Sequence, residues 1–237
     1  MNIFFPKEPE FETRVSLTLE SAKKFLDKGL DVSIEKSFAE HLGSSEKDFE
    51  ELGVKIFSRD EGFSNAEIIC SVRNISEEEL EKIKAGTLLV SFLDPFNEKS
   101  LVKKIKEKNI SAISMELIPR ITRAQKMDAL SSQANLAGYS AVIIASHELQ
   151  KALPMMMTAA GTISPSKVFV IGVGVAGLQA IATAKRLGAK VEAFDTRPVV
   201  EEQVKSLGAR FVKIDIGETG ETDQGSAKEL TSEQIEM

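Results

Sequence analysis

Gly172, Gly174 and Gly177 have the spacing of a turn that could hold a phosphate group. An apolar strand predicted at 167–172 leads into the first glycine, and an apolar-faced helix predicted at 178–187 follows the last. The first glycine permits a tight turn, the second leaves no side chain between the backbone and a pyrophosphate, and the third lets the helix pack closely on the strand. The start of the helix would offer N–H groups and the positive end of its dipole to phosphates.

An acidic residue, Asp195, follows the next predicted strand, 190–194, about 20 residues after Gly174. A carboxylate at this place accepts hydrogen bonds from an adenosine ribose and repels a 2′-phosphate, which favours NAD(H) over NADP(H). Arg197 leaves alternatives open, because it could serve a 2′-phosphate, stack on an adenine or pair with Asp195. A glycine turn that binds nothing is the plainer interpretation, but strand, glycines, helix and acid together favour dinucleotide binding.

A second polar group, Arg120, Gln125 and Asp128, comes after a proline in the middle of the chain. If residues 123–131 are helical, Gln125, Asp128 and Ser132 lie on or near one face, because they are spaced by three and four residues. An amide, a carboxylate and a hydroxyl could hold a carboxamide such as that of nicotinamide. A capped, solvated helix start would explain the same residues, and composition does not decide between the two.

Composition places the chain among soluble globular proteins. Its 237 residues allow one large domain or two ordinary ones, with 42% hydrophobic and 28% charged residues. The net charge of −6 argues against non-specific nucleic-acid binding, and a single cysteine excludes an internal disulfide and a cysteine-rich metal site. No signal peptide and no apolar run of about 18 residues is evident. His41 and His147 lack metal-ligand neighbours in sequence, so we predict no metal.

The pattern of apolar runs predicts the α/β class, with two Rossmann-like parallel-sheet domains joined by a helix. We place a Rossmann-like domain with the polar loop at 1–134 and the NAD(H)-binding domain at 135–237. Strands of the first domain are predicted at 3–5, 31–34, 55–57, 67–72, 87–93 and 112–115. Helices are predicted at 19–28, 77–84 and 98–108, the first capped by Thr18 and the second by Ser76 in a capping box.

The second domain has weaker patterning toward its end. A connecting helix is predicted at 131–149, a helix at 201–207 and a third strand at 210–214. Met155–Met157 are interpreted as packing filler beneath this domain. The polar stretch 217–225 is interpreted as a mobile loop. Three strands are half of a six-stranded dinucleotide-binding sheet, so we expect this domain to be incomplete.

Three segments, 115–133, 154–162 and 172–189, closely resemble proton-translocating NAD(P) transhydrogenases. The resemblance is to the soluble NAD(H)-binding domain that begins the alpha subunit, and it extends over most of the chain. It implies three groups of site residues. In the loop, Arg120, Gln125, Asp128 and Ser131 would position the nicotinamide and its ribose, and Ile121, Thr122, Lys126 and Met127 would also bind the cofactor. The pyrophosphate turn would comprise Gly172, Val173, Gly174, Val175 and Gly177, and the adenosine-ribose end would comprise Asp195, Thr196 and Arg197.

The same resemblance implies a mechanism and partners. NADH would bind this chain, NADP⁺ would bind a domain of the beta subunit, and hydride would pass directly between the nicotinamides. A membrane-spanning subunit would couple the transfer to proton translocation, with the chain a cytoplasmic homodimer held peripherally at the inner face of the plasma membrane. The chemistry then belongs to the cofactors, which agrees with the lack of an obvious catalytic histidine in the sequence.

The chain departs from the family in two respects. The family's domain is longer and closes its second sheet with later strands. The family's mobile loop carries a tyrosine in a Gly-Gly-Tyr-Ala-Lys-Glu run, where this chain has Ser226 within residues 224–229. The aromatic side chain that could cover the adenine in the family is therefore missing at this position.

Two alternatives remain. Alanine dehydrogenase is a relative whose substrate-carboxylate arginine resembles Arg14, but Asp94 stands at the catalytic histidine position and Arg73 at a lysine position. These changes remove the acid–base partner for an amino-acid substrate. A non-catalytic or truncated NAD-binding module is the other alternative, since an unclosed sheet exposes an edge strand.

Overall fold

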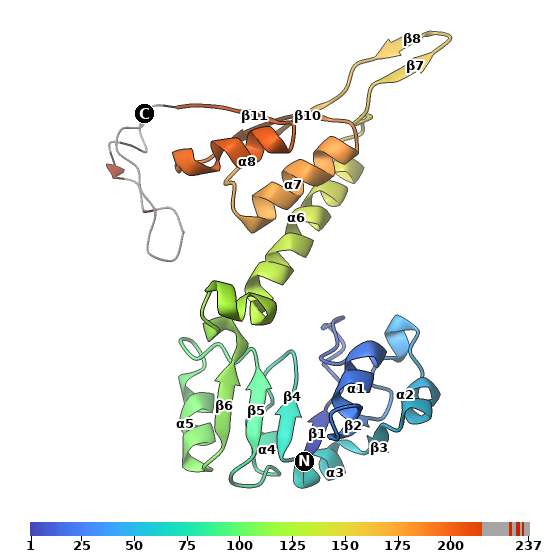
Figure 1. The fold of residues 1–237 in the computed structure, drawn as a ribbon, viewed down its shortest axis with the longest axis vertical. Coiled ribbons are helices and arrows are strands. Elements are labelled where there is room, and N and C mark those ends of the chain that lie inside the picture. Colours follow the sequence, from blue (N-terminus) through green and yellow to red (C-terminus); the bar gives the residue numbers. More distant parts are fainter. Residues whose placement is uncertain (215–227, 229–230, 233, 235–237) are drawn as a thin grey trace. The chain divides into compact units, whose positions relative to one another are not determined.

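The computed structural model describes residues 1–214, 228, 231–232 and 234. The chain divides into two compact units, Met1–Met127 and Asp128–Met237. Each is an α/β unit built on a parallel sheet, which confirms the predicted fold class (Figure 1). The division falls just before helix α6 (Ala129–Glu148), whereas the predicted domain boundary lies within that helix.

Unit 1 contains a six-stranded parallel sheet in the order β3-β2-β1-β4-β5-β6. This is the doubly wound order, in which the winding direction reverses between β1 and β4. The bounds differ from the predicted ones by one to two residues at most ends: β1 (Asn2–Phe5), β2 (Asp31–Glu35), β3 (Lys55–Phe57), β4 (Ile68–Cys70), β5 (Leu88–Ser91) and β6 (Ser111–Ser114).

Alternation along β1 explains why this strand lies in the middle of the sheet. Ile3 and Phe5 belong to one buried apolar cluster, while Phe4 between them belongs to another. Because successive side chains of a strand point to opposite faces, β1 is buried on both sides. The Phe4 ring meets that of Phe63 edge to face, with 5.7 Å between the centroids.

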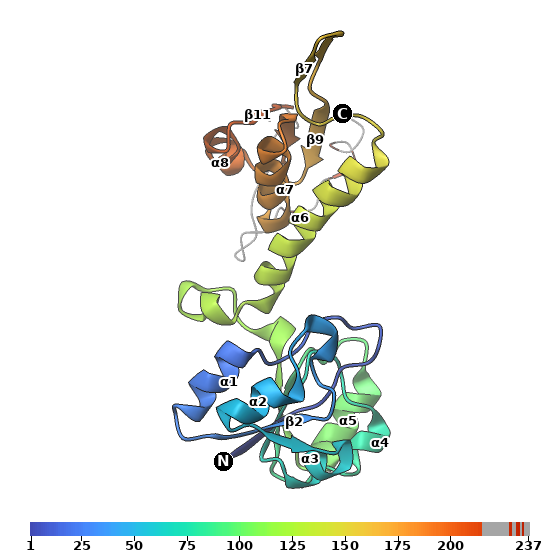
Figure 2. The same ribbon diagram turned by 90° about the vertical axis from the view of Figure 1, so that its right-hand side faces the viewer.

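The helices of unit 1 cover both faces of the sheet, and side-chain caps begin most of them (Figure 2). Thr18 caps α1 and Ser76 caps α4 in a capping box, as predicted. Capping boxes also start α2 at Ser45 and α3 at Ser58. Helix α4 ends sooner than predicted. The α-helices of unit 1 are α1 (Leu19–Leu26), α2 (Glu46–Leu52), α3 (Arg59–Asn65), α4 (Glu77–Leu80) and α5 (Lys99–Glu107), and a 3₁₀ turn, η1 (Glu40–Leu42), precedes α2.

Unit 2 has a three-stranded parallel sheet in the order β11-β10-β9 among its described residues. Val191 and Ala193 of β10 share a buried cluster with Ile181 of the preceding helix and Val204 of the following one. Helix α6 lies along α7, as both ribbon views show. The bounds are β9 (Lys167–Ile171), α7 (Val175–Arg186), β10 (Lys190–Phe194), η4 (Pro198–Val200), α8 (Glu201–Ser206) and β11 (Arg210–Phe211).

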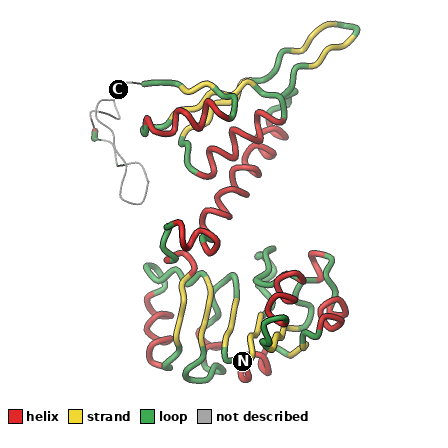
Figure 3. The backbone as a smooth tube through the Cα atoms, viewed as in Figure 1, coloured by secondary structure: helices red, strands yellow, loops and turns green. Residues whose placement is uncertain are grey.

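The interpretation of the three methionines as packing filler is wrong. Met156 and Met157 belong to a two-stranded antiparallel hairpin of β7 (Met156–Thr158) and β8 (Gly161–Ile163), which extends from the rest of unit 2 (Figure 3). Met155, Met156 and Met157 are all exposed, the last by 80%. Their apolar character indicated burial, but a projecting hairpin gives them few neighbours.

Helix length and hydropathy also bear on membranes. Among the described residues, none of the helices is both long enough and apolar enough to cross a bilayer.

The stretch 217–225, interpreted as a mobile loop, and Ser226 lie outside the described residues.

A close contact in unit 1 gives a first prediction. A Cβ atom at Gly62 of α3 would lie 2.1 Å from the ring of Phe4, which is fully buried. Gly62→Ala should therefore lower the free energy of unfolding by about 1 to 3 kcal/mol, as overpacking of a core does. Urea denaturation measures the change. Ser64→Ala on the same helix is the control and should change little; equal stability of both variants would contradict the packing described here.

Candidate functional site

The three glycines form the predicted turn between β9 and α7. Gly172 has φ +89°, a left-handed conformation that L side chains rarely adopt, and its N–H donates to Phe194 O at 2.8 Å. A Cβ at Gly177 would lie 1.9 Å from Gly172 O. The helix therefore starts directly against the end of the strand, and only glycine fits at Gly177.

The start of helix α7 lies in the glycine turn. Gly174 is its N-cap residue, and within the described part of the chain no side chain caps it. The first backbone bond into the helix runs from Leu178 N to Gly174 O, so the N–H groups of Val175, Ala176 and Gly177 precede it. A Cβ at Gly174 would meet none of the described atoms within 4 Å. This end of the helix fits an anionic group that approaches the backbone.

Asp195 lies directly after β10 and contacts the turn. Its Oδ2 accepts the Val173 N–H at 2.6 Å, and its Oδ1 accepts the Arg197 backbone N–H at 2.8 Å. The Arg197 guanidinium adds Nε to Oδ1 at 2.9 Å and Nη2 to Oδ2 at 3.0 Å. Of the alternatives open for Arg197, the structure shows the pairing with Asp195. Thr196 between them is half-buried.

The protonation of Asp195 follows from these contacts. Burial raises the pKa of Asp195, but the hydrogen bonds from Arg197 and from the Val173 N–H outweigh it, so the pKa lies below its ordinary value. Asp195 is therefore a carboxylate at neutral pH. It carries its charge beside the turn, with its side chain 5% exposed.

The polar loop has a different local structure from the one considered in the sequence. Residues 123–131 are not one helix: a 3₁₀ helix, η3 (Thr122–Met127), ends before Asp128, which then caps α6. Asp128 accepts the Ser131 N–H at 2.9 Å and the Ser131 hydroxyl at 2.7 Å. The premise that placed Gln125 and Asp128 on one helical face is wrong, because a cap residue does not continue the preceding turn.

The other residues of this loop are largely open to solvent. Six of them are exposed, namely Arg120, Ile121, Thr122, Gln125, Lys126 and Met127. Asp128 and Ser131 are half-buried and belong to unit 2, as the glycine turn does, whereas the six exposed residues belong to unit 1. The short 3₁₀ turn η2 (Met115–Leu117) precedes the loop. Contact between the residues of the polar loop and a nicotinamide stays a prediction.

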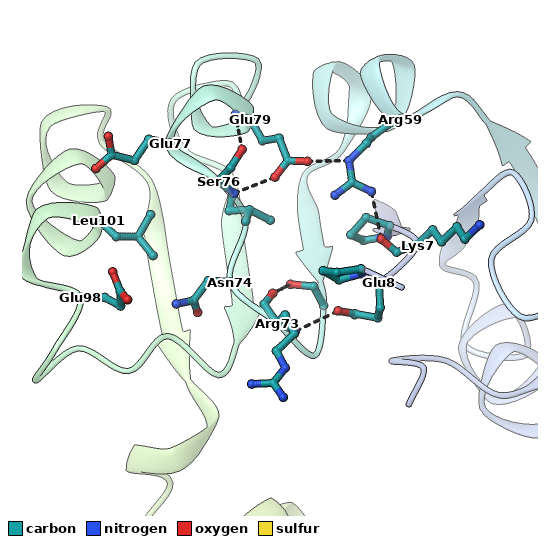
Figure 4. Close-up of a pocket in the computed structure, with 14 residues that line it drawn as sticks. Lys7, Glu8, Arg59, Arg73, Asn74, Ser76, Glu77, Glu79, Glu98 and Leu101 are labelled. Carbon is teal, nitrogen blue, oxygen red and sulfur yellow. Dashed lines mark hydrogen bonds and ion pairs between the residues drawn. The ribbon is translucent and has the colours of Figure 1, made fainter. Parts of the chain in front are cut away.

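Unit 1 has a cavity of about 420 Å³, which no motif in the sequence predicted (Figure 4). Residues after β1, including Glu8, and after β4, including Asn74, line it together with Arg59 of α3. Beside it, Glu8 accepts the backbone N–H groups of Val72 at 2.6 Å and of Arg73 at 3.0 Å. Burial raises the pKa of Glu8, against the opposing effect of these bonds. The Glu8 carboxylate thus accepts the backbone N–H groups at the place where the strand order of the sheet reverses.

Arg14 and Arg73, which stand at two substrate-binding positions of alanine dehydrogenase, share one buried partner. Glu12, whose side chain is 4% exposed, pairs with Arg14 at 2.6 Å and with Arg73 at 2.7 Å. The hydrogen bond from Arg14 is the largest cause that lowers the pKa of Glu12 to about 2. Asp94 has φ 47°, and its backbone N–H donates to Glu116.

Sequence reasoning missed one contributor to the site, Gly138 of α6. A Cβ there would lie 2.1 Å from Ala176 O in the first turn of α7, so α6 approaches the turn backbone to backbone. Small residues such as Ala137 and Ala141 lie near it in the sequence, but residue type does not identify the partner helix. The pairing of Val173 with Asp195 was likewise invisible, because it uses a backbone group.

Comparison with known proteins assigns the chain to a family. Residues 4–137 match the model of the alanine dehydrogenase/PNT N-terminal domain, and residues 141–237 match the model of the alanine dehydrogenase/PNT C-terminal domain. The first part of NAD(P) transhydrogenase subunit alpha from Rickettsia prowazekii (strain Madrid E) is 47% identical over 227 residues, which cover 94% of this chain and 59% of that protein. The protein of the same name from Rhodospirillum rubrum is 44% identical over 242 residues, 98% of this chain and 63% of that protein.

Solved structures agree with these sequence matches. The crystal structure of transhydrogenase from Sinorhizobium meliloti superposes with a TM-score of 0.86 at 44% identity, covering 90% of this chain and 64% of that one. The chain thus spans less than two thirds of the length of these relatives. The resemblance to transhydrogenases seen in the sequence is confirmed, and the chain belongs to the alanine dehydrogenase/PNT family.

Proposed function

We propose that this chain is the NAD(H)-binding component of a proton-translocating NAD(P) transhydrogenase. The observation that carries the proposal is the N-terminus of α7, which no described side chain caps and which begins at the Gly174 turn. Support also comes from the relatives named as the first part of NAD(P) transhydrogenase subunit alpha. The whole enzyme's activity belongs to the proposal, because the chain spans only a portion of those relatives.

The turn fits a dinucleotide diphosphate on physical grounds. The position of a Cβ at Gly174 is clear of described atoms, and the N–H groups of the first turn of α7 lie beyond it. We expect Gly172, Val173, Gly174, Val175 and Gly177 to border the diphosphate. Asp195, Thr196 and Arg197 would border the adenosine ribose. Asp195 brings a negative charge to this end of the site, which opposes a 2′-phosphate.

The polar loop would serve the other end of the cofactor. Bound NADH supplies a hydride, and the protein supplies orientation and exclusion of water. We propose that Arg120, Gln125, Asp128 and Ser131 position the nicotinamide and its ribose, flanked by Ile121, Thr122, Lys126 and Met127. Direct transfer needs no general acid or base, so these side chains act by hydrogen bonding alone.

The partners follow from the same proposal. The relatives' names describe one piece of an alpha subunit, and hence a component of a multi-subunit protein. We propose that NADP⁺ is held by the NADP-binding domain of a beta subunit, and that a membrane-spanning subunit couples transfer to protons. The chain would be a homodimer, attached through these partners to the inner face of the plasma membrane.

Alanine dehydrogenase activity is less well supported. Asp94 occupies the position expected for the catalytic histidine, and Arg14 and Arg73 both pair with Glu12. An assay with pyruvate, ammonia and NADH separates the two functions, because only an amino-acid dehydrogenase would oxidise NADH in it. A non-catalytic NAD-binding module would bind NADH but would pass no hydride to NADP⁺ on a partner.

The first test concerns Asp195. Asp195→Asn should weaken NADH binding about tenfold, because an amide accepts on one oxygen only and cannot keep the bonds to both Val173 and Arg197. It should also reduce the preference for NADH over NADPH, because the negative charge at the ribose end is lost. Calorimetric titration of the purified chain with each cofactor measures both effects. Glu192→Gln, at a more exposed position on β10, is the matched control and should bind both cofactors as the unchanged chain does. Unaltered affinity and selectivity in Asp195→Asn would count against the assignment.

The second test concerns the polar loop. Gln125→Ala and Asp128→Asn should each slow hydride transfer from NADH to an NADP⁺ analogue on the partner domain by about tenfold or more, with smaller losses of NADH affinity. Asparagine caps helices about as well as aspartate, so Asp128→Asn tests the charge without removing the cap of α6. Single-turnover kinetics with an added beta-subunit NADP-binding domain provide the rate. Equal rates in both variants and the unchanged chain would refute the loop assignment.

A further inference from the structure

Arg197 and Asp195 together enclose the backbone of Val173. The carboxylate accepts the Val173 N–H at 2.6 Å, and Arg197 Nη2 donates to Val173 O at 3.2 Å. The guanidinium also binds both carboxylate oxygens, through Nε at 2.9 Å and Nη2 at 3.0 Å. The peptide groups of the turn residue between two glycines are therefore fastened to the end of β10.

The pair of Asp195 and Arg197 differs from a surface ion pair in two respects: it is buried, and the protein fills the acceptor positions of the carboxylate. The side chain of Arg197 is 12% exposed and that of Asp195 is 5% exposed. A carboxylate offers about four acceptor positions, and here the protein fills four, with the N–H of Val173 and three donors of Arg197. Removal of one partner would leave the other charge buried without its counter-ion, which is costly.

We propose that Arg197 is a positioning and specificity-determining residue for the dinucleotide. It holds Asp195 against Val173, so that the glycine turn is fixed for a diphosphate, and in doing so it keeps its guanidinium away from a 2′-phosphate. The inference rests on the proposed binding of NAD(H) to unit 2 and goes beyond it, because it assigns the selectivity to a pair rather than to the acid alone.

The turn needs such an anchor because its glycines have no side chains to provide one, and the bond from Gly172 N–H to Phe194 O fixes only its first residue. Gly172 and Gly174 have no side chains, and glycine loses more conformational freedom on ordering than other residues do. Val173 is buried, but its peptide groups are fixed by Asp195 and Arg197. A planar guanidinium can bind two carboxylate oxygens and a carbonyl at once, whereas the point charge of lysine cannot reproduce this geometry.

The pair makes a prediction that charge repulsion alone does not make. When Asp195 is neutral, the guanidinium is released from its counter-ion and can bind a 2′-phosphate, as arginines in NADP sites do. The gain in NADPH affinity of Asp195→Asn should therefore require Arg197. If Asp195 acts only by repelling the phosphate, the gain should be the same with and without the arginine.

The experiment is a double-mutant cycle on the full chain, with NADH and NADPH titrated by calorimetry. The variants are Arg197→Met, Arg197→Lys, Asp195→Asn and Asp195→Asn with Arg197→Met. Arg210→Met, which breaks the exposed pair with Glu192 on the same sheet, is the control. Hydrogen exchange of the Val173 amide, followed by NMR, reports on the turn directly.

We expect Arg197→Met to weaken NADH binding about tenfold and to accelerate exchange at Val173 by about tenfold or more, with Arg197→Lys between it and the unchanged chain. Asp195→Asn should gain about tenfold in NADPH affinity, and the double variant should lose that gain. Arg210→Met should change none of these values. Should Arg197→Met fail to fold, Arg197→Lys and Asp195→Asn provide the same comparison of exchange and affinity.

Other results would overturn the inference. If the unchanged chain binds NADH and the Arg197 variants show the same NADH affinity and the same exchange rate at the Val173 amide, Arg197 has no positioning role. The proposed function would then stand. An NADPH gain of the same size in both arginine backgrounds removes the specificity role. If the unchanged chain does not bind NADH at millimolar concentration, the proposed function fails and this inference fails with it.

Discussion

The close approach between Gly177 and Gly172 is the constraint on which the proposed cofactor site depends. A single methyl group at Gly177 would overlap the Gly172 carbonyl, so α7 can begin only because this position is bare. The helix consequently starts at the carboxyl end of β9, with the N–H groups of its first turn and its positive dipole end beyond the turn. A dehydrogenase module needs this arrangement, since it lets a diphosphate reach the backbone.

Both units are built on a parallel sheet, but they differ in how the backbone N–H groups beyond the carboxyl ends of their strands are hydrogen-bonded. In unit 1 the order of strands reverses between β1 and β4, the place where doubly wound proteins bind ligands. There the Glu8 carboxylate already accepts the N–H groups of Val72 and Arg73. In unit 2 a carboxylate also approaches the turn, but Asp195 takes the Val173 N–H, and no described side chain caps the start of α7. This difference is why we place the dinucleotide on unit 2, although both units are built on the same kind of sheet.

Those features that depend on local sequence could be predicted. The glycine spacing indicated the turn, the apolar run of β1 indicated a buried strand, and Ser76 with Glu79 indicated a helix start, because each depends on residues within one turn or strand. Asp195 could be placed beside the turn, since parallel neighbours bring their carboxyl ends together.

What required the structure was contact between distant groups. The bond of Val173 to Asp195 and the contact of Gly138 with Ala176 both use backbone atoms, which leave no mark on residue type. The apolar character of Met157 predicted burial, but this residue lies exposed in a projecting hairpin. In the polar loop, the capping role of Asp128 ended the preceding turn, which a spacing argument alone could not reveal.

Whether a diphosphate binds at the start of α7 is tested by the response of individual backbone amides to NADH, followed by NMR on the isotope-labelled chain. We expect the largest shifts on saturation at the amides of Gly174, Val175, Ala176 and Gly177, because the diphosphate would accept hydrogen bonds there. Saturation with NADH that leaves these four amides unmoved, while amides beside Glu8 in unit 1 shift, would contradict this expectation.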